Sequence, residues 1–206
     1  MIELVLAMSL VWCGAGQAQT APAALAVQTA ATAAEEVGVI TTDVGRIVIR
    51  FFPDVAPNHV DNFKDLARTR FYDGTTFHRV VPGFVIQGGD PNSKDDDPRN
   101  DGLGDGPRQL KAEFNDRPHV RGSLSMARSR DPNSASCQFF IVLEESPQSR
   151  ALDGKYTLFG EVIEGMDTVE RIVELAGPVA ARTQKPRKPV VMRSVRIDRR
   201  PPTEND

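Results

Sequence analysis

The chain has 206 residues, of which 40% are hydrophobic and 26% are charged, a balance typical of one globular domain with tails. Two cysteines and three widely spaced histidines cannot form a disulfide framework or a four-ligand zinc site, so we expect no metal and no cofactor. The net charge of −3 comes from the first 36 residues, which hold three Glu and no Lys or Arg. Removing those three from the 28 acidic residues leaves 25 against 25 basic residues. Without a basic excess, nucleic acid is not an expected partner.

The first 18 residues have the pattern of a secretory signal peptide. Residues 2–12 are mostly apolar, and Gly16-Gln17-Ala18 offers a small-residue cleavage site, although Glu3 stands where a basic residue is usual. The apolar run is too short for a stable membrane anchor. Residues 19–36 are rich in Ala and Thr and predict a disordered linker. We therefore expect a periplasmic or secreted protein without a membrane anchor.

The rest of the chain alternates short β-branched runs with Gly and Pro, a pattern typical of strands and turns. Residues 37–41 and 46–51 predict a hairpin in which Gly45 takes a positive φ. Residues 57–68 predict a helix, because a proline begins it and apolar residues recur at helical spacing. Eight strands and two helices indicate an all-β barrel or sandwich. The remaining strands are predicted at 76–80, 84–87, 122–127, 138–143, 157–162 and 190–197, the second helix at 166–175, and a long loop at 90–108.

Four ordered blocks form the most specific motif in the chain. Residues 77–90 read FHRVVPGFVIQGGD, and GSLSMA, CQFFI and LDGKY follow at 122–127, 137–141 and 152–156. Together they resemble the cyclophilin-type peptidyl-prolyl cis/trans isomerases over roughly residues 37–197. The resemblance implies a closed eight-stranded antiparallel β-barrel with a helix over each end and a groove on its outer surface. On this basis we assign residues 37–198 to the isomerase domain and 199–206 to a flexible tail.

The resemblance also implies which residues act. It makes Arg79 the catalytic side chain, with Gln87 beside it in the groove. Ala127 and Arg128 match the segment whose backbone pairs with the substrate, although Arg128 replaces a more usual Asn. The substrate-binding positions implied by the resemblance are Phe84, Val85, Ala127, Arg128, Gln138, Phe140, Leu152 and Tyr156.

These residue types suit rotation about an X–Pro bond, which amide resonance resists with a barrier of roughly 18–20 kcal/mol. A fixed guanidinium can donate to the proline nitrogen once that nitrogen becomes pyramidal, and only the twisted state gains from this bond. An apolar pocket holds the ring meanwhile. The expected partner is a proline-containing polypeptide, bound by a monomer. The alternative is a chaperone module that binds proline segments with incidental turnover, but the retained Arg79 favours the enzyme.

Three other features have structural interpretations. Strand alternation turns His78 away from the Arg79 face, and Cys137 is expected to be a buried small side chain rather than a reactive thiol. The Asp-rich stretch within residues 90–108 does not match an EF-hand loop, because Arg99 and Arg108 stand where calcium ligands belong. We interpret it as a solvated acidic loop.

Overall fold

The computed structural model describes residues 34–177 and 184–201. The predicted signal peptide, most of the predicted linker and the last five residues of the predicted tail lie outside the described residues. The first strand begins at Glu35 and the last ends at Arg200. Two residues of the predicted linker and two of the predicted tail therefore belong to the sheet.

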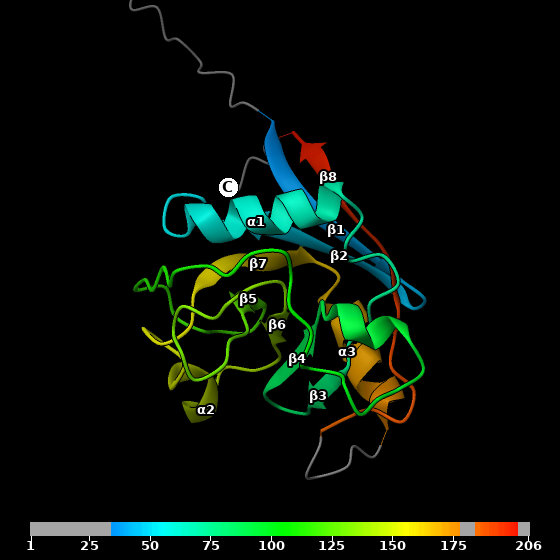
Figure 1. Cartoon of the computed structure of the whole chain (residues 1–206). Coiled ribbons are helices and arrows are strands. Elements are labelled where there is room, and N and C mark those ends of the chain that lie inside the picture. Colours follow the sequence, from blue (N-terminus) through cyan, green and yellow to red (C-terminus); the bar gives the residue numbers. More distant parts are fainter. Residues whose placement is uncertain (1–33, 178–183, 202–206) are drawn as a thin grey trace, which may run out of the picture. The chain divides into compact units, whose positions relative to one another are not determined.

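The described residues form one eight-stranded antiparallel sheet with the order β3-β4-β6-β5-β7-β2-β1-β8 (Figure 1). Each predicted strand is present, with ends that differ by a few residues. The first hairpin is also confirmed: Gly45 has φ +146°, and a Cβ there would clash with the Thr168 side chain. The strands are β1 (Glu35–Thr42), β2 (Gly45–Phe51), β3 (Arg79–Val81), β4 (Val85–Gly88), β5 (Ser123–Met126), β6 (Phe139–Val142), β7 (Leu158–Glu164) and β8 (Met192–Arg200).

The sheet is curled but not closed, so the prediction of a closed barrel is wrong in this respect. The edge strands β3 and β8 share no continuous ladder. One isolated bridge, between Thr76 and Val191, links the segments that precede them. β3 has only three residues, and Pro189, just before that bridge, has no N–H with which to continue a ladder.

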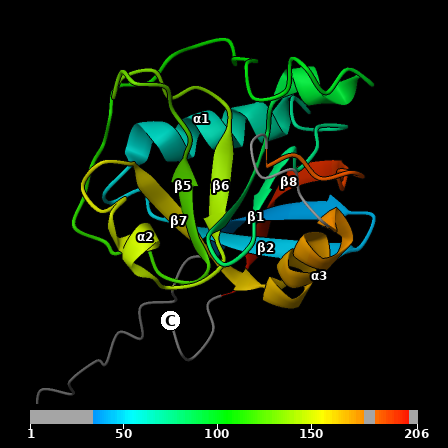
Figure 2. The ribbon, with the colours of Figure 1, turned by 90° about the horizontal axis from the view of Figure 1, so that it is seen from below.

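Two long helices pack into the same core from different ends of the curled sheet, and Figure 2 shows them well apart. Helix α1 (Pro57–Arg68) has the predicted bounds, and Pro57 occupies its first turn. Helix α3 (Met166–Ala176) ends one residue later than predicted. Two short elements were not predicted, α2 (Pro147–Arg150) and the 3-10 helix η1 (Pro91–Lys94), because four residues are too few to show a helical period.

Alternation along β6 separates two apolar clusters. Phe139 is fully buried in the main core, where its ring lies 5.4 Å from that of Phe63 on α1. Phe140, the next residue, points to the opposite face of the sheet. There it packs with Val85 and Val142, and with the partly buried Phe84 and Leu152, in a separate cluster. The outer surface of the sheet therefore carries an apolar patch independent of the core.

Candidate active site

The outer patch is hollowed into a pocket of about 190 Å³. Strands β3, β4 and β6 contribute to it, together with the β3–β4 turn, the segment after β5 and the turn between α2 and β7. Nine of the ten sequence-predicted site residues meet here. The lining residues are Arg79, Phe84, Val85, Gln87, Ala127, Arg128, Phe140, Leu152 and Tyr156.

Arg79 is half-buried and held from two sides. It is the first residue of β3 and lies opposite Gln87 in the register with β4. Its Nη1 donates to Oε1 of Gln87 at 3.1 Å, and its Nε donates to Oε1 of Gln184 at 2.7 Å. Gln184 was not predicted, since no sequence pattern links it to a residue 105 positions earlier. Burial lowers the pKa of the Arg79 guanidinium, but arginine remains charged at neutral pH.

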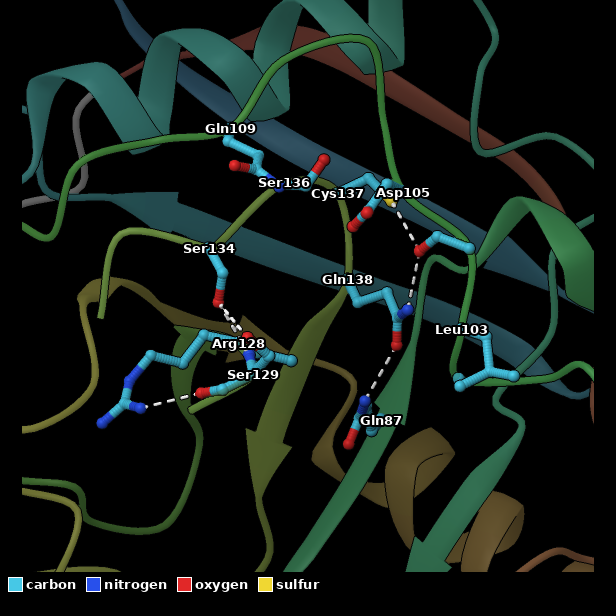
Figure 3. Close-up of a pocket in the computed structure, with 13 residues that line it drawn as sticks. Gln87, Leu103, Asp105, Gln109, Arg128, Ser129, Ser134, Ser136, Cys137 and Gln138 are labelled. Atoms are coloured by element: carbon cyan, nitrogen blue, oxygen red, sulfur yellow. Dashed lines mark hydrogen bonds between the residues drawn. The ribbon is translucent and has the colours of Figure 1, made fainter. Parts of the chain in front are cut away.

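Gln87 continues a chain of hydrogen bonds away from the arginine (Figure 3). Its Nε2 donates to Oε1 of Gln138 at 2.9 Å, and Nε2 of Gln138 donates to the Gly104 carbonyl at 2.8 Å. Each amide therefore accepts on one side and donates on the other, which fixes its orientation. Gln138 does not line the apolar pocket. It lines a second pocket beside it, so it is the one predicted site residue that lies outside the apolar pocket.

The adjoining pocket has a volume of about 280 Å³ and a mostly polar lining (Figure 3). It shares Gln87, Ala127 and Arg128 with the apolar pocket. Leu103, from the long loop, lies at its rim and is 75% exposed. The two pockets thus form one groove that passes the guanidinium of Arg79.

Phe140 forms the floor of the apolar pocket, and two rings hold it in place. Tyr156 meets it edge-on at 5.7 Å, and the buried His119 stacks beneath it at 6.2 Å. His119 is fixed in turn by Asp153, 2.9 Å from Nδ1, and Ser125, 3.1 Å from Nε2. Burial lowers the pKa of His119. This Ser–His–Asp series was not predicted, and Ser125 is fully buried, so it supports the floor rather than offering a nucleophile.

Arg128 forms the rim between the two pockets. Its guanidinium lies 4.5 Å above the Tyr156 ring, a favourable cation–π distance. Its Nε and Nη2 both donate to the Lys155 carbonyl, at 3.0 and 2.8 Å. The side chain therefore ties the end of β5 to the turn before β7.

The remaining sequence interpretations concern His78, Cys137 and possible metal ligands. His78 is buried and lines a different cavity from Arg79, as alternation predicted. Burial raises the pKa of the Cys137 thiol to about 12, which makes it unreactive at neutral pH. Within residues 34–177 and 184–201, no His, Cys, Asp and Glu side chains are grouped as metal ligands, and no helix there has the length and apolarity to cross a membrane.

Comparison with known proteins identifies the family. The model of the family described as cyclophilin type peptidyl-prolyl cis-trans isomerase/CLD matches residues 37–197. The chain belongs to the cyclophilin-type peptidyl-prolyl cis-trans isomerases. A probable peptidyl-prolyl cis-trans isomerase of Brucella abortus is 42% identical to this cyclophilin over 71% of the chain and 76% of the relative. Peptidyl-prolyl cis-trans isomerase B of Escherichia coli is 37% identical over 76% of the chain and 96% of the relative.

Solved structures agree with this assignment. A cyclophilin-type isomerase of Cryptosporidium parvum, crystallised in the presence of the dipeptide Ala-Pro, matches with a TM-score of 0.68 and 30% identity, over 79% of this chain and 98% of that one. Cyclophilin AquaCyp293 of Hirschia baltica matches with a TM-score of 0.61 and 27% identity, over 77% and 72%. The cyclophilin is therefore an enzyme that interconverts the cis and trans forms of X–Pro peptide bonds, rather than only a proline-binding chaperone.

Proposed function

We propose that Arg79 drives this isomerisation by donating a hydrogen bond to the proline nitrogen in the twisted transition state. The observation that carries the proposal is the double anchoring of its guanidinium beside an apolar pocket. The two bonds use two of the five N–H donors of arginine, and the others remain for the substrate. Because the planar amide has little basicity at nitrogen, the donor stabilises the twisted state more than the ground state.

The apolar pocket receives the proline ring in this proposal. Phe84, Val85, Phe140 and Leu152 supply its hydrophobic walls. With the ring held, the chain on the other side of the bond can rotate while Arg79 stays in place. The substrate backbone runs along the segment that follows β5. There the Ala127 N–H is already bonded to the Gln138 carbonyl at 2.9 Å, so pairing uses the Ala127 carbonyl or the Arg128 N–H.

The proposal extends to substrate, assembly and location. Proline-containing polypeptides are the substrates, which is supported by the Ala-Pro present with the Cryptosporidium neighbour. The enzyme acts as a monomer, since one chain supplies every residue of the groove described above. It acts in the periplasm or after secretion, because residues 1–18 have the composition of a signal peptide.

Arg79→Ala tests the mechanism. We expect kcat/KM for a short X–Pro peptide to fall at least ~100-fold, the scale of losing one preorganised charge-stabilising donor. Exchange spectroscopy by NMR on a peptide that populates both isomers measures this without a coupled protease. Arg130→Ala, which removes an exposed arginine from the loop after β5, is the matched control. A folded Arg79→Ala enzyme with the wild-type rate contradicts the mechanism.

A further inference from the structure

The connection between α3 and β8 reaches the catalytic arginine. Its described part begins at Gln184 and lies along β3, the edge strand that begins with Arg79. The Val80 N–H donates to the Gln184 carbonyl at 2.9 Å. Hence the backbone of this connection is fixed on the strand that carries the arginine, and the Gln184 side chain points at the guanidinium.

We propose that Gln184 is a positioning residue for the reaction, whose side-chain oxygen holds Nε of Arg79 and so sets the direction of the donors offered to the substrate. The proposal rests on the catalytic role proposed for Arg79. Gln184 is not among the residues that line the apolar pocket, so it acts through the arginine rather than on the proline.

Two acceptors fix a guanidinium where one does not. Gln87 alone would bind Nη1 and leave the guanidinium able to swing about the long side chain. A second acceptor, 2.7 Å from Nε, removes that freedom. A donor held in advance does not have to be reorganised during the reaction, and small misplacements of a catalytic group cost large factors in rate.

The backbone of Gln184 adopts a strained, left-handed conformation, which is common for residues that hold a functional group in place. Its φ is +55°, and among the described residues Arg70 is the other non-glycine with a positive φ. A residue with a long side chain disfavours this conformation, so surrounding contacts have to hold it there. The hydrogen bond from Val80 and the bond to Arg79 are the contacts that compensate for it.

The Asp-rich loop supports the same connection from the other side. Lys185, the next residue, donates from Nζ to the Pro98 carbonyl and shares a cavity of about 380 Å³ with Asp95, Asp96 and Asp101. Burial raises the pKa of Asp101, and the Lys185 ammonium offsets part of that rise. The loop therefore holds Lys185, and through it Gln184, in addition to being solvated as the sequence predicted.

Two variants remove the bond in different ways. Gln184→Met keeps the length of the side chain but has no acceptor. Gln184→Asn keeps an amide and tolerates a positive φ, but its oxygen is one methylene too short to reach Nε. For both we expect kcat to fall about tenfold, on the scale of one hydrogen bond to a charged group, with KM changed less than about twofold. Gln184→Glu keeps the acceptor and should retain most of the activity.

The controls separate this proposal from the one on which it rests. Gln148→Met changes an exposed glutamine on α2 and should leave kcat unaltered, with thermal melting checked for every variant. In an Arg79→Ala background, Gln184→Met should cause no further loss, because the two residues act as a unit. A wild-type kcat in both Met and Asn variants, a Glu variant as slow as the Met variant, or additive losses would each overturn the proposal. If instead Arg79→Ala is itself fully active, the proposed mechanism fails first.

Discussion

Acid sensitivity of the fold should depend strongly on His78. The residue precedes β3, is 2% exposed, and has no well-formed hydrogen bond at either ring nitrogen within the described residues. Burial lowers its pKa from 6.5 to about 4, against a smaller upward effect of the Asp90 carboxylate. The folded protein therefore keeps this imidazole neutral in a range where the unfolded chain protonates it.

The size of the effect follows from the two pKa values. Below pH 6.5 the unfolded state binds a proton that the folded state does not bind until about pH 4, so stability falls as the pH falls through this window. At 1.36 kcal/mol per pKa unit, the loss amounts to about 3 kcal/mol. His59 and His119 are also buried with lowered pKa values, so the share of His78 has to be isolated by substitution.

His78→Leu provides that isolation. Urea unfolding followed by circular dichroism gives the free energy of unfolding of wild type and variant at pH 7, 6, 5 and 4. Packing changes shift the two curves equally at every pH, whereas removing the titrating group makes the variant lose about 3 kcal/mol less than wild type between pH 7 and 4. Activity at pH 7 should stay near wild type, because His78 faces away from the groove. A constant difference between the two proteins from pH 7 to pH 4 would refute the buried neutral histidine.

Four further outcomes are expected. Phe140→Leu should raise KM by a factor about ten times larger than the factor by which it lowers kcat, because the pocket floor loses its ring contacts with His119 and Tyr156. An unchanged KM would show that Phe140 is not part of the binding surface. Alkylating reagents at pH 7 should leave Cys137 unlabelled until urea is added, because its pKa is raised to about 12; peptide mass spectrometry shows this directly. EDTA should leave the isomerase rate unaltered, and a loss restored by one divalent ion would contradict that. The exported fraction should contain a chain without its first 18 residues, and recovery of intact chain from the cytosol alone would disprove export.

Local sequence was enough to predict the eight strands and the two long helices, but not the four-residue elements α2 and η1. Helix α1 lies at residues 57–68 as predicted, because its apolar spacing and N-terminal proline are properties of twelve adjacent residues. The hairpin at Gly45 follows equally from neighbouring residues. The four ordered motif blocks indicated the family, and the resemblance implied the nine residues that line the apolar pocket. Such features need no knowledge of what lies across the fold.

The tertiary structure decided whatever depends on distant partners. Closure of the sheet depends on how far β3 extends and on whether the segment before β8, which contains Pro189, can continue the ladder, so the predicted closure was wrong. Gln184 lies 105 residues from Arg79 in the chain, so no local sequence pattern connects the two residues. A side-chain hydrogen bond depends on where two backbones meet, whereas periodicity records only which residues face the core. The sequence alone therefore determined the elements and the chemistry of the groove, and the fold determined how its arginine is held.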